Sequence, residues 1–226
     1  FSPFFVREVQ YDDGTPDVIT GTQEIVWWGT NTPGFGWASK FSPINDESIL
    51  LGAKAHILYN TAVMGSPDFL FRVLDDSGPN GSPGNELIPP QSVRLPSTNQ
   101  LAWWEIDLTD FQDSLALYRG DYYLSLEHPP NDTNAIFVAV DNSQPAVNHS
   151  WALVGTGSQT RQPGWYPLSE FSLGDDNVSL APYDLMFRAL VSFIDSEPPV
   201  FSTGFLQHPV FSENFDFYVV GKSELN

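Results

Sequence analysis

The segment Asp184-Leu-Met-Phe-Arg-Ala-Leu-Val-Ser-Phe193 decides the fold class. Every second residue from Leu185 to Phe193 is apolar, whereas Asp184, Arg188 and Ser192 occupy positions between them. Because successive side chains of a β-strand point to opposite faces, this pattern predicts a strand with one buried and one wetter face. Such alternation is typical of antiparallel sheets, since the strands of parallel sheets are apolar on both faces.

The same period of two recurs along the chain, between clusters of Gly, Pro, Asn and Asp. The expected inward positions are Ile49, Leu51, Ala53, Ala55, Ile57, Tyr59, Phe69, Phe71, Val73, Trp104, Ile106, Leu108, Tyr122, Leu124 and Leu126. The expected outward positions include Lys54, His56, Trp103, Glu105, Tyr123, Ser125 and Glu127. Further strands are expected at residues 5–11, 19–28, 36–41, 92–95, 136–140 and 150–154, and the longest loops at 75–90 and 155–169. The pattern predicts an all-β fold, an antiparallel two-sheet β-sandwich of jelly-roll type.

The last part of the chain has a different character. The run Asp195-Ser-Glu-Pro-Pro199 follows the strongest strand, and two adjacent prolines stop strand pairing and stiffen the chain. We therefore divide the chain into a β-sandwich domain, residues 1–195, and a Pro-Pro linker with an extension strand, residues 196–226.

The extension strand has an apolar face formed by Phe215, Phe217 and Val219. One or two isolated strands cannot bury such a face. We expect this segment either to begin a second domain or to pair with another copy of the protein, because an added strand can extend an open sheet edge.

Composition and charge exclude several classes of protein. The chain has 226 residues, 28 acidic and 9 basic, for a formal net charge of −19, and it has no cysteine. Nucleic-acid binding and binding to anionic membranes are disfavoured because both need clustered Lys and Arg. The absence of cysteine excludes disulfides and thiolate chemistry. The hydrophobic share of 41% argues against intrinsic disorder.

No apolar run in the sequence is long enough for a membrane span. The acidic, aromatic-rich composition favours a secreted or cell-surface protein.

Aromatic residues suggest one kind of binding site. Flat aromatic faces pack against the apolar faces of pyranose rings, and polar groups beside them bind the hydroxyl groups. Trp165 and Tyr166 lie in an expected loop, and Trp28 and Trp103 alternate with neighbours expected to be buried. These four residues are the candidate glycan contacts.

Paired acidic residues suggest a second kind of site, because calcium prefers several carboxylate and carbonyl oxygens. The candidate ligands are Asp12, Asp13, Asp75 and Asp76. None of these pairs matches an EF-hand loop.

Catalytic motifs are absent from the sequence. There is no Gly-x-Ser-x-Gly elbow and no His-Glu-x-x-His zinc motif. Glu105 and Glu127 are both expected to point away from the core, and a pair of carboxylates on one surface is what glycoside hydrolysis requires. Solvated surface charges explain them better, so we predict that the protein is not an enzyme.

The order of short motifs between residues 8 and 194 resembles the β-sandwich modules of large secreted, multi-domain surface proteins of bacteria. These motifs are Tyr11-Asp-Asp-Gly14, Trp27-Trp-Gly29, Trp37-Ala-Ser-Lys-Phe41, Phe71-Arg-Val-Leu-Asp-Asp-Ser-Gly78, Pro83-Gly84, Trp104-Glu-Ile-Asp-Leu108, Gly120-Asp-Tyr-Tyr-Leu124, His149-Ser-Trp151 and Asp184-Leu-Met-Phe-Arg-Ala189. The segment from Pro198-Pro199 onward resembles the opening of an Ig-like domain. The resemblance implies a non-catalytic module for adhesion, for carbohydrate or calcium binding, or for spacing.

Two functional hypotheses follow. The first is a structural module of a bacterial surface protein whose C-terminal strand docks on a neighbouring copy or domain, as in a filament or surface layer. The alternative is an accessory carbohydrate-binding or adhesion domain of a larger secreted enzyme.

Overall fold

The structure is a computed structural model, and it describes residues 4–12, 25–27, 34–46, 48–58, 68–95, 101–116, 118–128, 137–141, 149–156, 158, 161–173, 178–181 and 183–194. All of these belong to one compact unit, Phe1–Asp195. The extension strand predicted at Phe215, Phe217 and Val219 lies outside the described residues, so the predicted division of the chain stays a prediction.

Two antiparallel sheets form this unit. The seven-stranded sheet runs β1 (Phe4–Gln10), β15 (Phe187–Ile194), β4 (Ile49–Leu58), β9 (Phe137–Asp141) and β14 (Asp184–Leu185), with β2 (Ile25–Trp27) beside β9 and β7 (Ala102–Asp107) beside β4. The six-stranded sheet runs β11 (Gly164–Pro167), β10 (Ser150–Val154), β3 (Gly36–Phe41), β8 (Tyr122–Glu127), β5 (Asp68–Asp75) and β6 (Gln91–Arg94). The predicted all-β, two-sheet antiparallel sandwich is confirmed.

Short elements complete the unit. The strands β12 (Ser172–Leu173) and β13 (Val178–Ser179) form a separate pair, and the helical turns are η1 (Pro79–Gly81), η2 (Thr109–Phe111), α2 (Gln112–Leu115) and η3 (Leu168–Glu170). No helix in the described ranges is long and apolar enough to cross a membrane.

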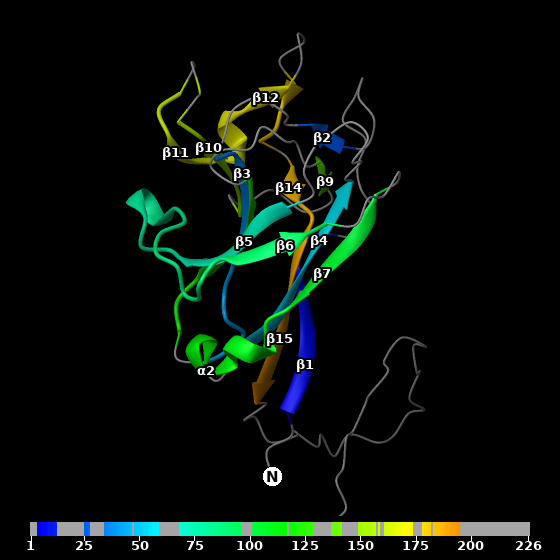
Figure 1. Ribbon diagram of the computed structural model, residues 1–226, viewed down its shortest axis with the longest axis vertical. Helices are drawn as coiled ribbons and strands as arrows, with labels where there is room; N and C mark the ends of the chain where they lie inside the picture. The colour runs from blue at the N-terminus through cyan, green and yellow to red at the C-terminus, as the bar shows by residue number, and fades with distance from the viewer. Residues whose placement is uncertain are drawn as a thin grey trace, which may run out of the picture. The chain divides into compact units, whose positions relative to one another are not determined.

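Consecutive strands tend to lie in different sheets. From β3 to β10 the chain leaves one sheet for the other at every connection except that between β5 and β6. Neighbours within a sheet are therefore distant in sequence, as in a jelly roll. Figure 1 shows β1 and β15 side by side, with their far ends at the opposite end of the unit from β10, β11 and β12.

The core lies between the inner faces of the two sheets. Its buried residues include Trp37, Phe41, Ala53, Ala55, Ile57, Phe69, Phe71, Val73, Leu124, Leu126, Leu185, Phe187, Ala189 and Val191. Most of these occupy the inward positions that alternation predicts. Their burial supplies the main driving force for folding, because apolar area removed from water contributes about 25 cal/mol per Å².

A β-bulge corrects the prediction at the start of β4. Val191 of β15 pairs with Leu50, whereas Leu190 pairs with Gly52, so Leu51 is an extra residue in the ladder. The bulge reverses the alternation there. Leu50 is therefore buried, while Ile49 and Leu51, the expected inward residues, are only partly buried.

The strand predicted at residues 184–193 is also interrupted. Met186 separates β14 from β15, donating its backbone N–H to the Ala139 carbonyl oxygen and accepting from the His56 N–H. The expected wet face is therefore lost at this end, and Asp184 is only 4% exposed. Asp184 lies directly opposite Asp141 of β9, which is equally buried.

Candidate functional site

The outer face of the six-stranded sheet carries a second apolar cluster. Ala38, Leu74, Tyr123 and Trp151 are buried there, and the half-buried Trp165 packs against them. Tyr123 and Trp151 meet edge to face with ring centroids 6.0 Å apart. These residues occupy outward positions on β3, β5, β8, β10 and β11. This part of the sheet is therefore buried on both faces, whereas alternation predicts a sheet with one face exposed to solvent.

The loop between β5 and β6 covers part of this outer face. Asn80 and Gly81 take left-handed conformations, with φ of 58° and 73°, which reverse the chain at η1. The Tyr123 hydroxyl donates to the Gly81 carbonyl oxygen and ties the loop to the sheet. The base of the loop closes on Asp75, whose carboxylate accepts from the Ser77 and Asn85 backbone N–H groups at 3.0 and 2.6 Å.

A groove of about 380 Å³ lies beside the loop on the same face. It is lined by Tyr11, Lys40, Ser42, Asn80, Gly81, Asp121, Tyr123, His149, Trp151 and Pro167. Strand pairing assembles the floor, because Lys40 of β3 is opposite Tyr123 of β8, and Trp151 of β10 is opposite Pro167 of β11. We call this site the outer groove.

An ion pair occupies one side of the outer groove. Lys40 Nζ lies 2.8 Å from Asp121 Oδ2, and the Ser42 hydroxyl donates to Asp121 Oδ1 at 2.7 Å. Burial opposes ionisation of Asp121, but the hydrogen bonds from Lys40 and Ser42 outweigh it and lower the pKa of this carboxyl. The Lys40 ammonium also lies 5.9 Å from the centre of the Tyr123 ring. The pair thus presents both a hydrogen-bond donor and an acceptor beside an aromatic face.

An aromatic pair occupies another part of the lining. The rings of Tyr11 and His149 have centroids 4.0 Å apart. Burial lowers the pKa of His149, and the nearby Lys40 charge acts in the same direction, so the imidazole is neutral at neutral pH. Burial likewise raises the pKa of the Tyr11 hydroxyl. Tyr11 and His149 therefore present uncharged polar atoms on aromatic rings.

The arrangement has the properties of a binding site. Its volume falls within the range of about 300–1,000 Å³ typical of small-molecule sites, which combine aromatic walls with a few polar groups. Asp121 is the one carboxylate among the residues described as lining the outer groove, and Lys40 neutralises it. Across the described ranges, no group of three or more His, Cys, Asp or Glu side chains is placed to hold a metal ion.

The four predicted glycan contacts do not form one site. Trp165 lies on the outer face of β11, two residues from Pro167 of the outer groove. Tyr166 points the other way, packs against the core and meets Phe171 edge to face. The predicted loop at 155–169 contains strand β11, and this strand separates the two rings. Trp28 lies outside the described residues.

Trp103 lies on the other side of the sandwich. It belongs to β7 of the seven-stranded sheet, where its ring stacks on His56 at 4.8 Å and lies 4.0 Å from the Arg188 guanidinium carbon. The Trp103 ring thus already packs against two neighbouring side chains, His56 and Arg188.

The predicted calcium ligands also lie apart. Asp12 binds the Arg188 guanidinium, and Asp75 accepts the loop hydrogen bonds described above. Asp76 Oδ1 accepts from the Tyr118 hydroxyl at 3.3 Å. Asp13 lies outside the described residues. The aspartates have structural partners here, and calcium binding stays a prediction.

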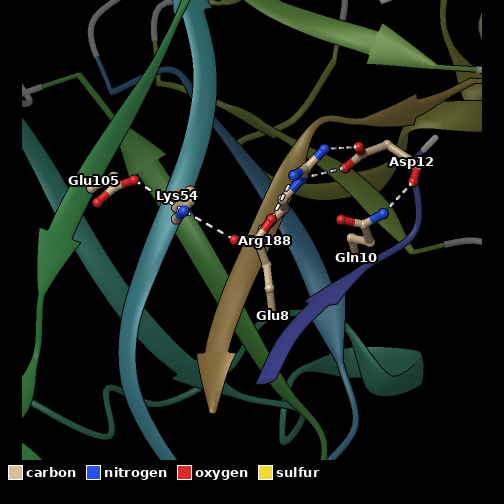
Figure 2. A network of polar contacts seen from close by, with 6 residues as sticks. All are labelled: Glu8, Gln10, Asp12, Lys54, Glu105 and Arg188. Atoms are coloured by element: carbon tan, nitrogen blue, oxygen red, sulfur yellow. Dashed lines mark hydrogen bonds and ion pairs between the residues drawn. The ribbon is translucent and has the colours of Figure 1, made fainter. Parts of the chain in front are cut away.

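A charge network covers the outer face of the seven-stranded sheet (Figure 2). Lys54 of β4 binds Glu8 of β1 at 2.9 Å and Glu105 of β7 at 3.0 Å, while Arg188 of β15 bridges Glu8 and Asp12. The expected outward positions of Lys54, Glu105 and Arg188 are confirmed.

Glu105 and Glu127 do not share a surface. Glu127 lies on the outer face of the six-stranded sheet, so the two carboxylates are on opposite sides of the sandwich. Burial raises the pKa of Glu127, although its hydrogen bond from Arg72 at 3.0 Å and another from Ser125 act against the rise. The pair cannot act on one glycosidic bond.

Sequence reasoning missed most of the outer groove. Its residues come from six separate stretches of the chain. Several of them stand in the quoted motifs, namely Tyr11, Lys40, Asp121, Tyr123, His149 and Trp151. The sequence does not show that these motifs meet in space.

Comparison with known proteins identifies no family. No family model matches the chain, and no curated protein matches it. A solved structure of the clostridial cysteine protease Cwp84 after propeptide cleavage has a TM-score of 0.48 and 10% identity, over 83% of this chain and 40% of that one. A structure of the cysteine protease and lectin-like domains of Cwp84, a surface layer associated protein of Clostridium difficile, has a TM-score of 0.45 and 11% identity, over 72% of this chain and 33% of that one. This chain spans less than half of either structure, and likeness at these scores is no basis for transferring a function.

Proposed function

We propose that this chain is a non-catalytic, extracellular binding module of a surface protein, and that its outer groove binds an uncharged saccharide. The observation that carries the proposal is the composition of the groove. The half-buried Tyr11 ring and the Lys40–Asp121 ion pair line it, above a floor to which the buried Tyr123 and Trp151 contribute. Sugars offer apolar ring faces and hydroxyl groups that both donate and accept, and this lining has a counterpart for each.

The charges of the groove favour a neutral ligand. Lys40 and Asp121 cancel one another, and His149 is neutral at neutral pH because burial lowers its pKa. An anionic ligand would compete with Asp121 for Lys40, and a cationic ligand would compete with Lys40 for Asp121. A hydroxyl group, in contrast, can hydrogen-bond to both partners without separating them.

The carboxylates support binding without cleavage. Glycoside hydrolysis requires two carboxyl groups on either side of the scissile bond. Of the residues described in the lining, Asp121 alone has a carboxylate, and its lowered pKa makes it a poor general acid.

A glycan array followed by calorimetry tests this function. The full chain should bind at least one neutral glycan class, and Tyr11→Ala and Lys40→Ala should each weaken binding about tenfold or more, the loss of about 1.4 kcal/mol expected for a good contact. Trp103→Ala is the matched control, because it removes an aromatic ring from the opposite face and should leave affinity unchanged. Absence of binding to every glycan, or equal losses in all three variants, would refute the proposal.

A place outside the cell is supported by the acidic, cysteine-free composition. An assembly role through the strand predicted at Phe215, Phe217 and Val219 requires a surface that receives this strand. The described residues offer one such surface, which is separate from the outer groove.

A further inference from the structure

The seven-stranded sheet has an open edge at β1. Among the strands that the structure describes, β1 pairs with β15 and with no other. Alternate residues of Phe4–Gln10 therefore direct their backbone N–H and C=O groups to a side that has no partner among the described strands. Natural sheets normally protect such an edge, because it is a template for pairing with another chain.

The edge also exposes apolar surface. Val6 is 67% exposed, and it is the one large hydrophobic side chain among the described residues that is exposed to solvent. Its neighbour across the ladder is the small Ser192, which leaves the valine uncovered. On the other face of β1, Phe5 is half-buried against Phe193, and Val9 is partly buried against the core. An added strand would cover all three residues.

The chain itself supplies a candidate strand. The described part ends in β15 at Ile194, which pairs with Phe4, the first residue of the open edge. The chain continues to residue 226 and includes the alternating segment Phe215, Phe217 and Val219. In a strand added beside β1, its apolar side chains would lie on the same face of the sheet as Phe5 and Val9. The intervening Asp216 and Tyr218 would lie on the face that carries Val6.

We propose that the β1 edge of one copy receives residues 215–219 of a second copy as an added β-strand. The spacing allows this exchange. The 20 residues between Ile194 and Phe215 make 21 residue steps, which reach roughly 70 Å when extended at about 3.3 Å per step, and this is about three times the length of β1. Pro198 and Pro199 have no backbone N–H to donate to strand pairing, and their rings restrict the first part of this connection. Each copy then donates one strand and receives another, so the contact is head to tail and forms either a closed ring or an open chain.

The absence of cysteine makes the proposal directly testable. Full chains carrying the single substitution Val6→Cys are mixed under mild oxidation with full chains carrying Asp216→Cys, Phe217→Cys or Tyr218→Cys. A cross-link between the two chains appears as a band at twice the 25.1 kDa chain mass. Because alternate residues of a strand point to opposite faces, Asp216→Cys or Tyr218→Cys should react with Val6→Cys several-fold more than Phe217→Cys does.

Matched controls make every outcome decisive. Arg94→Cys places a thiol on β6, the edge strand of the other sheet, where the side chain is 73% exposed, and it should not cross-link above background. Equal yields from all three tail positions, a yield no higher than that of Arg94→Cys, or pairing of Val6→Cys mainly with itself would overturn the proposal. A doubly substituted chain, Val6→Cys with Tyr218→Cys, that closes only within one molecule would also overturn it.

The oligomeric state provides a second measurement. The full chain should show a mass that rises with concentration in light scattering. Val6→Lys adds a charge to the edge, as natural edge strands do, and should shift the protein toward monomer. An unchanged mass for Val6→Lys would contradict the proposal, and glycan binding by this variant should be retained because Val6 does not line the outer groove.

Discussion

Asp184 lies in a place that disfavours its charge, and removing that charge should stabilise the fold. Burial raises the pKa of its carboxyl from 3.8 to about 6, a hydrogen bond from Ser150 at 3.1 Å opposes the rise, and the charge of Asp141 directly opposite adds to it. Each pKa unit corresponds to about 1.4 kcal/mol, so ionisation of Asp184 costs the folded state about 3 kcal/mol at neutral pH. Asp184→Asn removes the charge, keeps the size of the side chain and retains an oxygen that can accept from Ser150.

The sign of the effect follows from proton binding. Between pH 3.8 and about 6 the folded state binds more protons at Asp184 than the unfolded state does, so the contribution of this group to stability falls as the pH rises. Below this window both states are protonated, and above it both are ionised. Asp184→Asn should therefore match the wild type near pH 4 and exceed its free energy of unfolding by about 3 kcal/mol above pH 7.

Urea unfolding followed by tryptophan fluorescence, at steps from pH 4 to pH 8, measures this difference. Other carboxyl groups, such as Glu8 and Asp121, titrate in both proteins and cancel in the comparison. Ser150→Ala is the matched control, because it removes a hydrogen bond that favours the ionised form and should lower stability most at high pH. An Asp184→Asn variant that is less stable than the wild type above pH 7, or a difference that does not change with pH, would show that the charge of Asp184 does not destabilise the fold.

Two further substitutions test other parts of the fold. Arg188→Met should lower the free energy of unfolding by about 3–5 kcal/mol, because it removes the positive partner of Asp12, whose side chain is only 2% exposed. Adding Asp12→Asn to this variant should recover part of the loss, as measured by urea titration. Gly52→Ala should destabilise the folded state by about 1–3 kcal/mol, because the new methyl group would lie 2.8 Å from the Ile106 carbonyl oxygen. Ser92→Ala, on the exposed side of β6, is the control and should have no measurable effect on thermal unfolding.

Alternation of residues predicted the fold class and several strands. The expected limits of residues 36–41 and 150–154 agree with β3 and β10, because both strands have regular partners on each side. The bulge at Leu51 was not predictable, since it is a relation between β4 and β15 and not a property of β4 alone. The burial of Asp184 was missed for a similar reason, because the break at Met186 places β14 against β9 and β3.

The candidate site was predicted less well than the fold. The sequence indicated aromatic residues as ligand contacts, but among those it selected Trp103 lies on the opposite face of the sandwich and Tyr166 packs against the core. An outward position predicts a solvated side chain, but Tyr123 is buried because a loop covers the sheet there. The outer groove depends on pairing between distant strands, which a single sequence does not encode in a readable way.

The pairing of Phe4 with Ile194 has a mechanical consequence. The described unit begins and ends at the same point of one antiparallel ladder, so a force that pulls these two residues apart acts across the strands. The rungs between β1 and β15 would then break one at a time, as in a zipper, and would not share the load. A strand added along β1 from a neighbouring molecule would leave this weak point unchanged while carrying tension along its own length.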